Sequence, residues 1–188
     1  MSPQFEEVFK DVHVAKKVIS VDECRYLIAK VGNAWDTQEE PVDKKPLWQT
    51  YEYGPHKAPA FLYGFATHLS KSLLIPAIAN LYQFDEAKLK AATFWPFMRK
   101  YFVGGREGFK LHPDPTYFTA LALLTEKTQF SGGNFMMRDR FYKKKKVVDL
   151  DLGDCVVFRG PHKHGVLPIT SGIRHSLNMF YWNPKEEN

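Results

Sequence analysis

Two residue types that commonly bind metals lie close together in the stretch "LHPDPTY", where His112 and Asp114 are separated by one proline. If this stretch is extended, residues i and i+2 point to the same side of the chain, so an imidazole and a carboxylate could share one ion. A third ligand could come from His164 in the later stretch "GPHKHGVLPITSGIRHSL". Two imidazoles and one carboxylate on one face of an octahedron leave three positions open, as in non-haem Fe(II) sites.

The His-x-Asp pair is a weak signal when taken alone, because it is common by chance and a surface turn explains it more often than a ligand pair. His162 is a rival to His164, since it lies two residues earlier and would face the same side of an extended chain. His175 alternates with its neighbours Arg174 and Ser176, and we expect it to face outward or to pack as a structural residue.

Helices are expected in the first half of the chain. The stretch "SVDECRYLIAKVG" contains a capping box, with Ser20 as N-cap and Glu23 three residues later, and Gly32 supplies a stop. Residues 60–84 also have a helical pattern, in which Pro76 marks a break or a new first turn.

The second half of the chain predicts β structure. Its short β-branched or aromatic runs are bounded by Gly, Pro and Asp: "TFWPFMRKYFVGG", "TYFTALALLT", "NFMMRDRFY", "KVVDLDLGDCVVF" and "RHSLNMFYW". Helices followed by many strands indicate an α+β, mainly β fold, built as a sandwich or open barrel flanked by helices.

Composition limits the classes of protein that fit. The 188 residues are 44% hydrophobic, which predicts one globular domain over 1–188. Two cysteines suit a reducing compartment, and no apolar stretch approaches the roughly 20 residues of a membrane span, so we expect a soluble cytoplasmic or nuclear protein. The formal charge of +5 owes much to "KKKK" at 143–146, which we interpret as an exposed, solvated turn between strands.

Several motifs together resemble the 2-oxoglutarate- and Fe(II)-dependent oxygenases, and especially their prolyl 4-hydroxylase-like branch. They are the His-x-Asp pair, "SGGNF", "LDLGDCVVF" and "HGVLPITSGIRHS", in the order and spacing of that family. The resemblance extends from "VISVDECRYLI" to "NMFYW" and implies a double-stranded β-helix, or jelly roll, with N-terminal supporting helices.

The resemblance also implies roles for single residues. His112, Asp114 and His164 would hold Fe(II), and Arg174 would bind the far carboxylate of 2-oxoglutarate through its planar guanidinium. Ser176 lies two residues beyond Arg174 on the same strand face and could donate its hydroxyl to the same carboxylate.

Tyr101 resembles a tyrosine that often lines the cosubstrate pocket in this branch, although an aromatic residue at a strand end is equally explained by the core. Related enzymes often have a tyrosine where Leu123 stands, so a hydroxyl such as that of Thr125 is a further candidate for the cosubstrate. Gly132 and Gly133 are expected to form a tight turn without chemistry of their own.

The reaction that the resemblance implies is hydroxylation of an unactivated C–H bond with O2, 2-oxoglutarate and ascorbate as an optional reductant. A prolyl or other residue of a protein or peptide is the preferred substrate, and a free amino acid or other small molecule is the alternative. A nucleic-acid demethylase ranks lower, because that branch usually has a second arginine where Phe180 stands. A non-catalytic jelly-roll domain also ranks lower, because such domains commonly lose one of the ligands or the arginine.

Residues 35–59 have no sustained period and predict a long irregular segment with one strand. A peptide hydroxylase would need a mobile, aromatic-lined lid, and this segment has the aromatic residues for it: Trp35, Trp48, Tyr51 and Tyr53. The same side chains could equally pack against the barrel, and both interpretations stay open. The oligomeric state is not predicted.

Overall fold

The computed structural model describes residues 3–39, 49–53, 58–138 and 144–182, and for residues 36–39 and 49–53 it describes the backbone alone. The helical elements are α1 (Val21–Val31), α2 (Ala60–Leu69), the π-helix η1 (Ser70–Leu74), α3 (Ile75–Tyr82), α4 (Glu86–Ala91) and the 3-10 turn η2 (Lys127–Gln129). The strands are β1 (Phe5–Phe9), β2 (Val12–Ala15), β3 (Asp36–Glu39), β4 (Gln49–Tyr53), β5 (Thr93–Phe102), β6 (Phe109–His112), β7 (Phe118–Leu123), β8 (Phe130–Gly132), β9 (Phe135–Arg138), β10 (Lys145–Val148), β11 (Cys155–Arg159), β12 (His164–Val166) and β13 (Ile169–Trp182).

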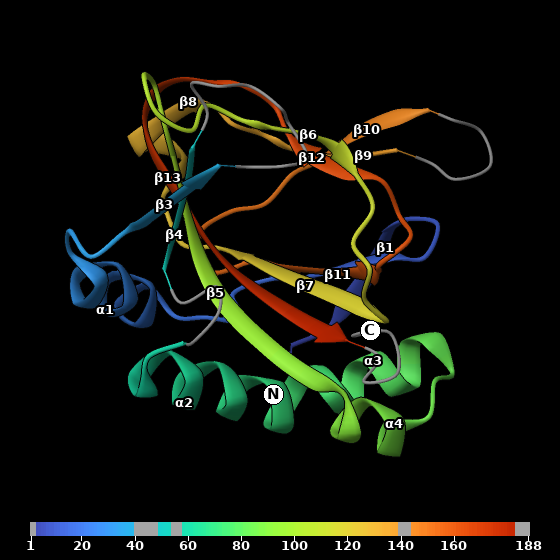
Figure 1. Ribbon diagram of the computed structural model, residues 1–188. Helices are drawn as coiled ribbons and strands as arrows, with labels where there is room; N and C mark the ends of the chain where they lie inside the picture. The colour runs from blue at the N-terminus through green and yellow to red at the C-terminus, as the bar shows by residue number, and fades with distance from the viewer. Residues whose placement is uncertain (1–2, 40–48, 54–57, 139–143, 183–188) are drawn as a thin grey trace.

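These strands form two sheets that face one another (Figure 1). In the described residues, the larger sheet has the order β1-β2-β11-β7-β13-β5-β4-β3, with β8 paired to β13 outside this path. The smaller sheet has the order β10-β9-β12-β6 and lies above the larger one in the view of Figure 1. Two facing antiparallel sheets are the architecture of a jelly roll, so the predicted fold class is confirmed.

The two faces of the larger sheet meet different surroundings, and β13 shows this most clearly. Leu177, Met179 and Tyr181 belong to a core shared with the helices. Arg174 and Ser176 alternate with that series and therefore face the smaller sheet. A second core, which includes Tyr101 on β5, Leu123 on β7 and Val166 on β12, fills the space between the sheets.

Helices cover the far face of the larger sheet, with α2, η1, α3 and α4 running beneath it in Figure 1. The predicted capping box of α1 is present, since Ser20 accepts a hydrogen bond from the Glu23 backbone N–H and Glu23 in turn accepts one from Ser20. Pro76 lies in the first turn of α3, where its missing N–H costs nothing, after a short π-helical stretch ends α2.

Two strands precede the first helix, which the expected order of helices followed by strands did not include. β1 and β2 form a hairpin, and β2 pairs with β11, so the start of the described chain extends the larger sheet. In the part of the expected irregular segment 35–59 that the structure describes there are two strands rather than one, and β4 pairs with β5. The rest of that segment, including Trp48, lies outside the described residues, as do the side chains of Tyr51 and Tyr53.

The lysine run is exposed in its described part, but it does not form a turn there. Lys145 and Lys146 begin β10, which pairs with β9, and Lys144 precedes that strand. The Nζ of Lys146 donates to the backbone oxygen of Val8, and Lys143 lies outside the described residues.

Cys24 and Cys155 are buried free thiols, and burial raises the pKa of each to about 12. Each lies in the core beneath the larger sheet, where it packs as a small apolar residue. Among the described helices, none is long and apolar enough to cross a membrane.

Candidate active site

The smaller sheet and the loop after β6 bring the predicted metal ligands together. His112 is the last residue of β6 and His164 the first of β12, and the two are paired in the register of the smaller sheet. Asp114 follows β6 by two residues, and its backbone N–H donates to the Gly160 oxygen over 2.8 Å. This hydrogen bond ties the loop that bears the carboxylate to the turn before β12.

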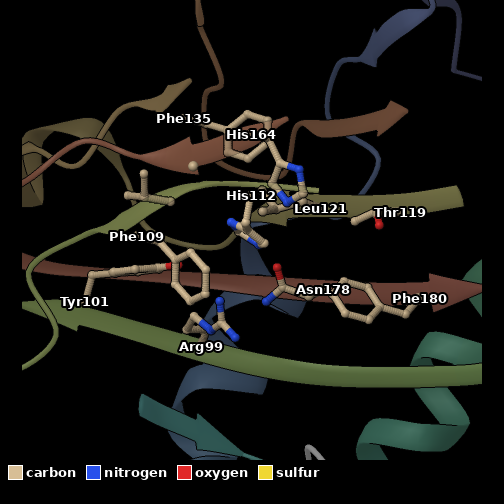
Figure 2. A pocket seen from close by; sticks show the side chains of 12 residues that line it. Arg99, Tyr101, Phe109, His112, Thr119, Leu121, Phe135, His164, Asn178 and Phe180 are labelled. Atoms are coloured by element: carbon tan, nitrogen blue, oxygen red, sulfur yellow. The ribbon is translucent and has the colours of Figure 1, made fainter. Parts of the chain in front are cut away.

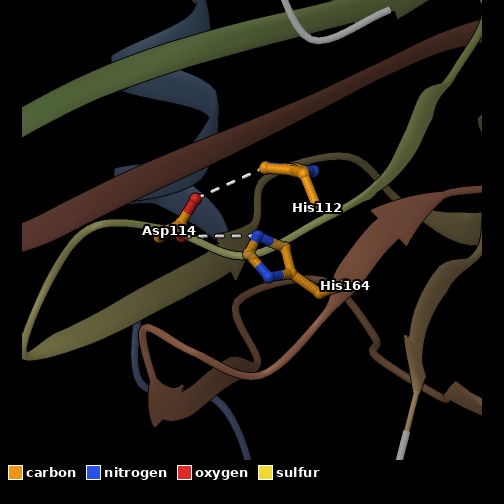
Figure 3. Close-up of side chains that lie close together, drawn as sticks. All are labelled: His112, Asp114 and His164. Carbon is orange, nitrogen blue, oxygen red and sulfur yellow. Dashed lines mark ion pairs between the residues drawn. The ribbon is translucent and has the colours of Figure 1, made fainter. Parts of the chain in front are cut away.

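The three side chains converge on one point between the sheets (Figure 3). Nε2 of His112 lies 3.4 Å from Oδ1 of Asp114, and Nε2 of His164 lies 3.3 Å from its Oδ2. One donor atom from each residue lies within 4.8 Å of the others. Two donors bound at right angles, each about 2.1 Å from one ion, would be about 3 Å apart, so this donor set fits a single divalent ion.

Local hydrogen bonds select the imidazole tautomer that such an ion needs. Nδ1 of His112 lies 2.8 Å from the Lys110 carbonyl oxygen, and Nδ1 of His164 lies 3.0 Å from the His162 carbonyl oxygen. Because a carbonyl oxygen can only accept, each Nδ1 carries the proton and donates it. Each Nε2 therefore presents its lone pair to the space beside Asp114, as in metal sites whose histidines are oriented by outer partners.

The charges of the site also suit a cation. Burial alone would raise the pKa of Asp114, but the imidazoles of His164 and His112 and the hydroxyl of Thr119 hold it below its ordinary value. Burial lowers the pKa of His164 to about 4, and the facing carboxylate of Asp114 opposes this only in part. Asp114 is thus held as the anion and His164 as the neutral ligand.

The rival histidines take other positions. His162 is buried, but the group of converging donor atoms consists of His112, Asp114 and His164; His162 supports the group through its backbone carbonyl. His175 faces away from this space, as expected from alternation: its ring packs 5.5 Å from that of Trp35. Trp35 itself donates from Nε1 to the Gly32 oxygen, so it packs beside α1 rather than over the candidate site.

Arg174 is 2% exposed and lies in the space between the sheets. Its guanidinium carbon lies 5.4 Å from the centre of the Tyr101 ring, and burial lowers the pKa of Arg174 while Tyr101 opposes that effect. Its Nη1 is buried and has no hydrogen-bond partner among the described residues. A buried guanidinium N–H without a partner is costly, and an anion placed there would remove that cost.

Gly133 makes room for this arginine. Its backbone has a φ of +63°, and a Cβ at this position would lie 3.2 Å from Cδ of Arg174. Gly132 before it has a φ of +71°, and a Cβ there would lie 2.3 Å from the Pro168 oxygen. Both glycines adopt positive φ values where β8 ends and the chain leads into β9, and Gly133 also shapes the surroundings of Arg174.

The hydroxyls proposed to assist Arg174 lie in different places. Ser176 is fully buried on the same face of β13 as Arg174, and its Oγ accepts a hydrogen bond from Nδ2 of Asn178 over 3.4 Å. Thr125 instead accepts from the backbone N–H of His175 over 2.9 Å, on the opposite face of β13, and the structure does not bring it to Arg174. Leu123, which stands where related enzymes often have tyrosine, is the register partner of Ser176.

A pocket between the sheets lies beside two of the predicted metal ligands and the face of β13 (Figure 2). His112 and His164 line it from the smaller sheet, and Tyr101, Arg99 and Asn178 line it from the larger one. A second pocket touches Arg174 and Gly133 from the side of η2 and β10. The two pockets share Phe135, so the converging donor atoms and Arg174 lie on either side of one ring.

Several residues of this pocket were not singled out from the sequence, and Arg99, Phe109, Thr119 and Asn178 are among them. Thr119 donates to Oδ2 of Asp114 over 2.6 Å and so orients that ligand. The available signal was a polar residue at an inward position of the apolar strand "FTALAL". Asn178 gives the same kind of signal, because it is polar and two residues beyond Ser176 on one strand face.

Comparisons with known proteins place this geometry in context. No protein-family model matches the chain. A curated relative, a PKHD-type hydroxylase of Pseudomonas putida (strain W619), is 27% identical over 122 residues, which are 59% of this chain and 52% of that protein. The chain thus matches about half the length of this relative.

Solved structures share the fold over nearly all of the chain. A prolyl-4-hydroxylase of Pseudomonas putida has a TM-score of 0.63 at 19% identity, with 92% of each chain covered. A prolyl hydroxylase of Trichoplax adhaerens, solved with a peptide fragment of a hypoxia inducible factor oxygen degradation domain, has a TM-score of 0.65 at 14% identity and covers 94% of this chain and 85% of its own. These findings confirm the resemblance that the motifs carried.

Proposed function

We propose that this chain, which resembles the 2-oxoglutarate- and Fe(II)-dependent oxygenases of the prolyl 4-hydroxylase-like branch in sequence and in fold, is a dioxygenase that hydroxylates an unactivated C–H bond. The observation that carries the proposal is the convergence of His112, Asp114 and His164, with both Nε2 lone pairs turned toward the carboxylate. Two histidines and one carboxylate leave open positions for a chelating cosubstrate and O2.

The anion site supports 2-oxoglutarate as the cosubstrate. Arg174 would bind the carboxylate far from the metal, because its buried Nη1 lacks a partner among the described residues and a guanidinium binds carboxylates in a bidentate manner. Tyr101 covers the guanidinium with its ring, and the burial of both side chains keeps water from competing for the ligand. Ser176 lies two residues beyond Arg174 on the same face of β13 and is a candidate to donate its hydroxyl to the same carboxylate.

In the reaction, the residues of this chain bind and orient. His112, Asp114 and His164 would hold Fe(II), and Thr119 keeps the carboxylate of Asp114 turned toward it. Iron bound there would activate O2, so that one oxygen atom enters succinate as 2-oxoglutarate loses CO2 and the other enters the substrate as hydroxyl. The aromatic side chains of Phe109, Phe135 and Phe180 line the pocket and would pack against the apolar part of a substrate.

A prolyl or other residue in a protein or peptide is the proposed substrate. The fold likeness to a hydroxylase solved with a peptide supports it. A free amino acid or another small molecule is the alternative substrate. A cytoplasmic or nuclear location is part of the same proposal and agrees with two buried, free cysteines.

The test is to add Fe(II) and 2-oxoglutarate to the purified protein without oxygen, admit O2 and measure succinate, first alone and then with candidate peptides and free amino acids. We expect slow succinate release alone and faster release with a true substrate. His164→Ala should abolish it, whereas His162→Ala, which keeps the backbone carbonyl that orients His164, is the matched control and should retain it. Metal binding lost in His162→Ala and kept in His164→Ala would contradict the ligand assignment.

A further inference from the structure

Three cations form a row across the smaller sheet, directly beside the two predicted histidine ligands. His112 on β6 is the register partner of His164 on β12, and Arg138 follows by one residue the β9 partner of His164. Lys145 on β10 is the register partner of Arg138. The backbone N–H of Arg138 donates to the oxygen of Lys163, the residue before His164, over 2.8 Å. Lys163, Arg138 and Lys145 are therefore neighbours on three adjacent strands, and we call them the basic row.

The smaller sheet has one face toward the larger sheet and one face turned away from it (Figure 1), and the basic row lies on the second. Lys145 lies three residues before Val148, which belongs to the core between the sheets, so alternation turns Lys145 and its register partner Arg138 outward. Lys163 is exposed and precedes the inward-facing His164. The other described residues of this face on β9, β10 and β12 are uncharged: Met136, Val147 and Gly165.

The basic row has no counter-charge in the described part of the chain. No ion pair or side-chain hydrogen bond joins its three members to another described residue. Lys16 and Lys127, by contrast, each lie within ion-pair distance of two carboxylates. Like charges directly opposite one another on antiparallel strands are destabilising, as Arg138 and Lys145 are here. A bound carboxylate would remove that repulsion, and a guanidinium can hold it through two N–H groups.

The basic row is also near the space in which a substrate would react. Lys163 and His164 are consecutive but point to opposite faces, so a ligand that contacts both must pass around the end of the sheet. Facing sheets pack about 10 Å apart, and the converging donor atoms lie between them. The path from the outer face into this space is thus about 10 Å or more, which three to four extended residues cover at about 3.3 Å each.

We propose that the basic row binds an acidic segment of the peptide substrate, three to four residues away from the residue that is hydroxylated. The inference rests on the proposed function and specifies its substrate: a peptide with two or three carboxylates close to the target. Adjacent strands are about 4.8 Å apart, so the three cations span roughly 10 Å, which matches a short extended segment. A nucleic acid would need phosphate contacts spread over a broader surface.

The test measures binding of two peptides to the full chain by ligand-observed NMR, without iron or O2. The acidic probe is acetyl-Pro-Gly-Gly-Gly-Glu-Glu-Glu-amide, and its neutral match has Gln in place of each Glu. We expect the acidic peptide to bind about tenfold more tightly at low ionic strength, and this preference to shrink at high salt because the cations are solvated. The triple variant Arg138→Gln, Lys145→Gln, Lys163→Gln should bind both peptides equally, and Lys163→Gln alone should lose part of the preference.

A matched control removes the same charge from the opposite side of the molecule. Lys30, Lys71 and Lys88 are exposed cations on α1, η1 and α4, and replacing all three with Gln should keep the preference for the acidic peptide. Equal losses in the two triple variants would show that net charge alone attracts the peptide, and would overturn the inference. Equal affinity for both peptides in the unmodified protein would do the same.

A single-stranded DNA octamer tests the other polyanion. If it binds more tightly than the acidic peptide and loses affinity in the basic-row variant, the surface belongs to nucleic acid and the inference is rejected. We expect it to bind no more tightly than the acidic peptide.

Titration with Mn(II) separates the two proposals. Failure of His112, Asp114 and His164 to bind the ion would reject the proposed function, whereas the acidic and neutral peptides test the basic row without metal. Once Mn(II) is bound, the proline protons of the acidic peptide should relax faster with the unmodified protein than with the basic-row variant, because the ion is paramagnetic. Equal relaxation would show that the acidic segment binds without bringing the target to the site, and would contradict the inference.

Discussion

Thr119 donates its hydroxyl proton to Oδ2 of Asp114 over 2.6 Å, and that same oxygen faces Nε2 of His164. Thr116 lies 3.1 Å from the Thr119 hydroxyl, so two buried hydroxyls form a short chain that ends on the carboxylate. Outer partners of this kind commonly change metal affinity by about 10–100-fold.

We therefore expect Thr119→Val, which has nearly the same shape, to weaken binding of a divalent ion by about tenfold or more. Thr119→Ser should keep the hydrogen bond and most of the affinity. Anaerobic titration with Fe(II), or titration with Mn(II), measures both. An unchanged affinity in Thr119→Val would show that the loop alone orients Asp114.

Arg174→Ala should weaken binding of 2-oxoglutarate by at least about tenfold, because a hydrogen bond to a charged group contributes about 1.5–3 kcal/mol and 1.4 kcal/mol is one decade. Arg174→Lys should recover part of the loss, since it keeps the charge but not the planar fork. Titration of the metal-loaded protein with 2-oxoglutarate gives the affinities. An unchanged affinity in Arg174→Ala would place the carboxylate elsewhere, and metal binding should survive in both variants.

His175 should make the protein less stable in acid. Burial, with help from Lys100 and Arg174, lowers its pKa to about 4, whereas an unfolded histidine titrates near 6.5. Because the unfolded state binds the proton more readily, stability is complete above about pH 6.5 and falls as the pH decreases toward 4. Between these values the loss approaches about 1.4 kcal/mol per pH unit for this one group.

Urea unfolding between pH 4 and 7 checks this expectation. His175→Gln should unfold more easily at pH 7, because it changes the contacts with Thr125 and Trp35, but its free energy of unfolding should vary less with pH. Equal pH dependence in the variant and the unmodified protein would show that other groups account for the sensitivity to acid.

Asp154 should be important for stability rather than for chemistry. Its carboxylate is 1% exposed and accepts hydrogen bonds from the Lys17 and Asp151 backbone N–H groups and from Nζ of Lys16. Asp154→Ala would remove the acceptor of the two backbone N–H groups and should cost roughly 2–4 kcal/mol. Asp149→Ala, at a side chain that is 79% exposed, is the control and should change the free energy of unfolding by less than about 0.5 kcal/mol.

Local signals in the sequence predicted the parts of the fold that depend on neighbouring residues. The capping box at Ser20 and the break at Pro76 arise within one helical turn, so no distant contact is needed to recognise them. The alternation along β13 likewise separates Arg174 and Ser176 from His175 without reference to other strands. The predicted metal ligands were assigned by resemblance, because the order and spacing of the motifs match those of a known family.

The sequence did not reveal the features that depend on pairing between strands far apart in the chain. β2 takes its place only through β11, and "VHVA" is too short to show this by itself. Thr125 lies two residues beyond the end of β7, where strand alternation no longer applies, so the sequence did not show that its hydroxyl bonds the backbone of His175. Arg99 belongs to an aromatic strand, and its closeness to His112 arises from the stacking of Phe109 between them.

The position of β13 in the larger sheet has a consequence for how the chain folds. β13 is the last strand of the described chain, yet it lies between β5 and β7 and pairs with both. Until it is in place, β5 and β7 each present an open edge, and such edges invite pairing with other chains. Because the central pairings join segments far apart in sequence, the loop-closure entropy must be lost before the contacts form, and folding should be slow for a protein of this size. Refolding at high concentration should therefore compete with aggregation, and low concentration should raise the yield.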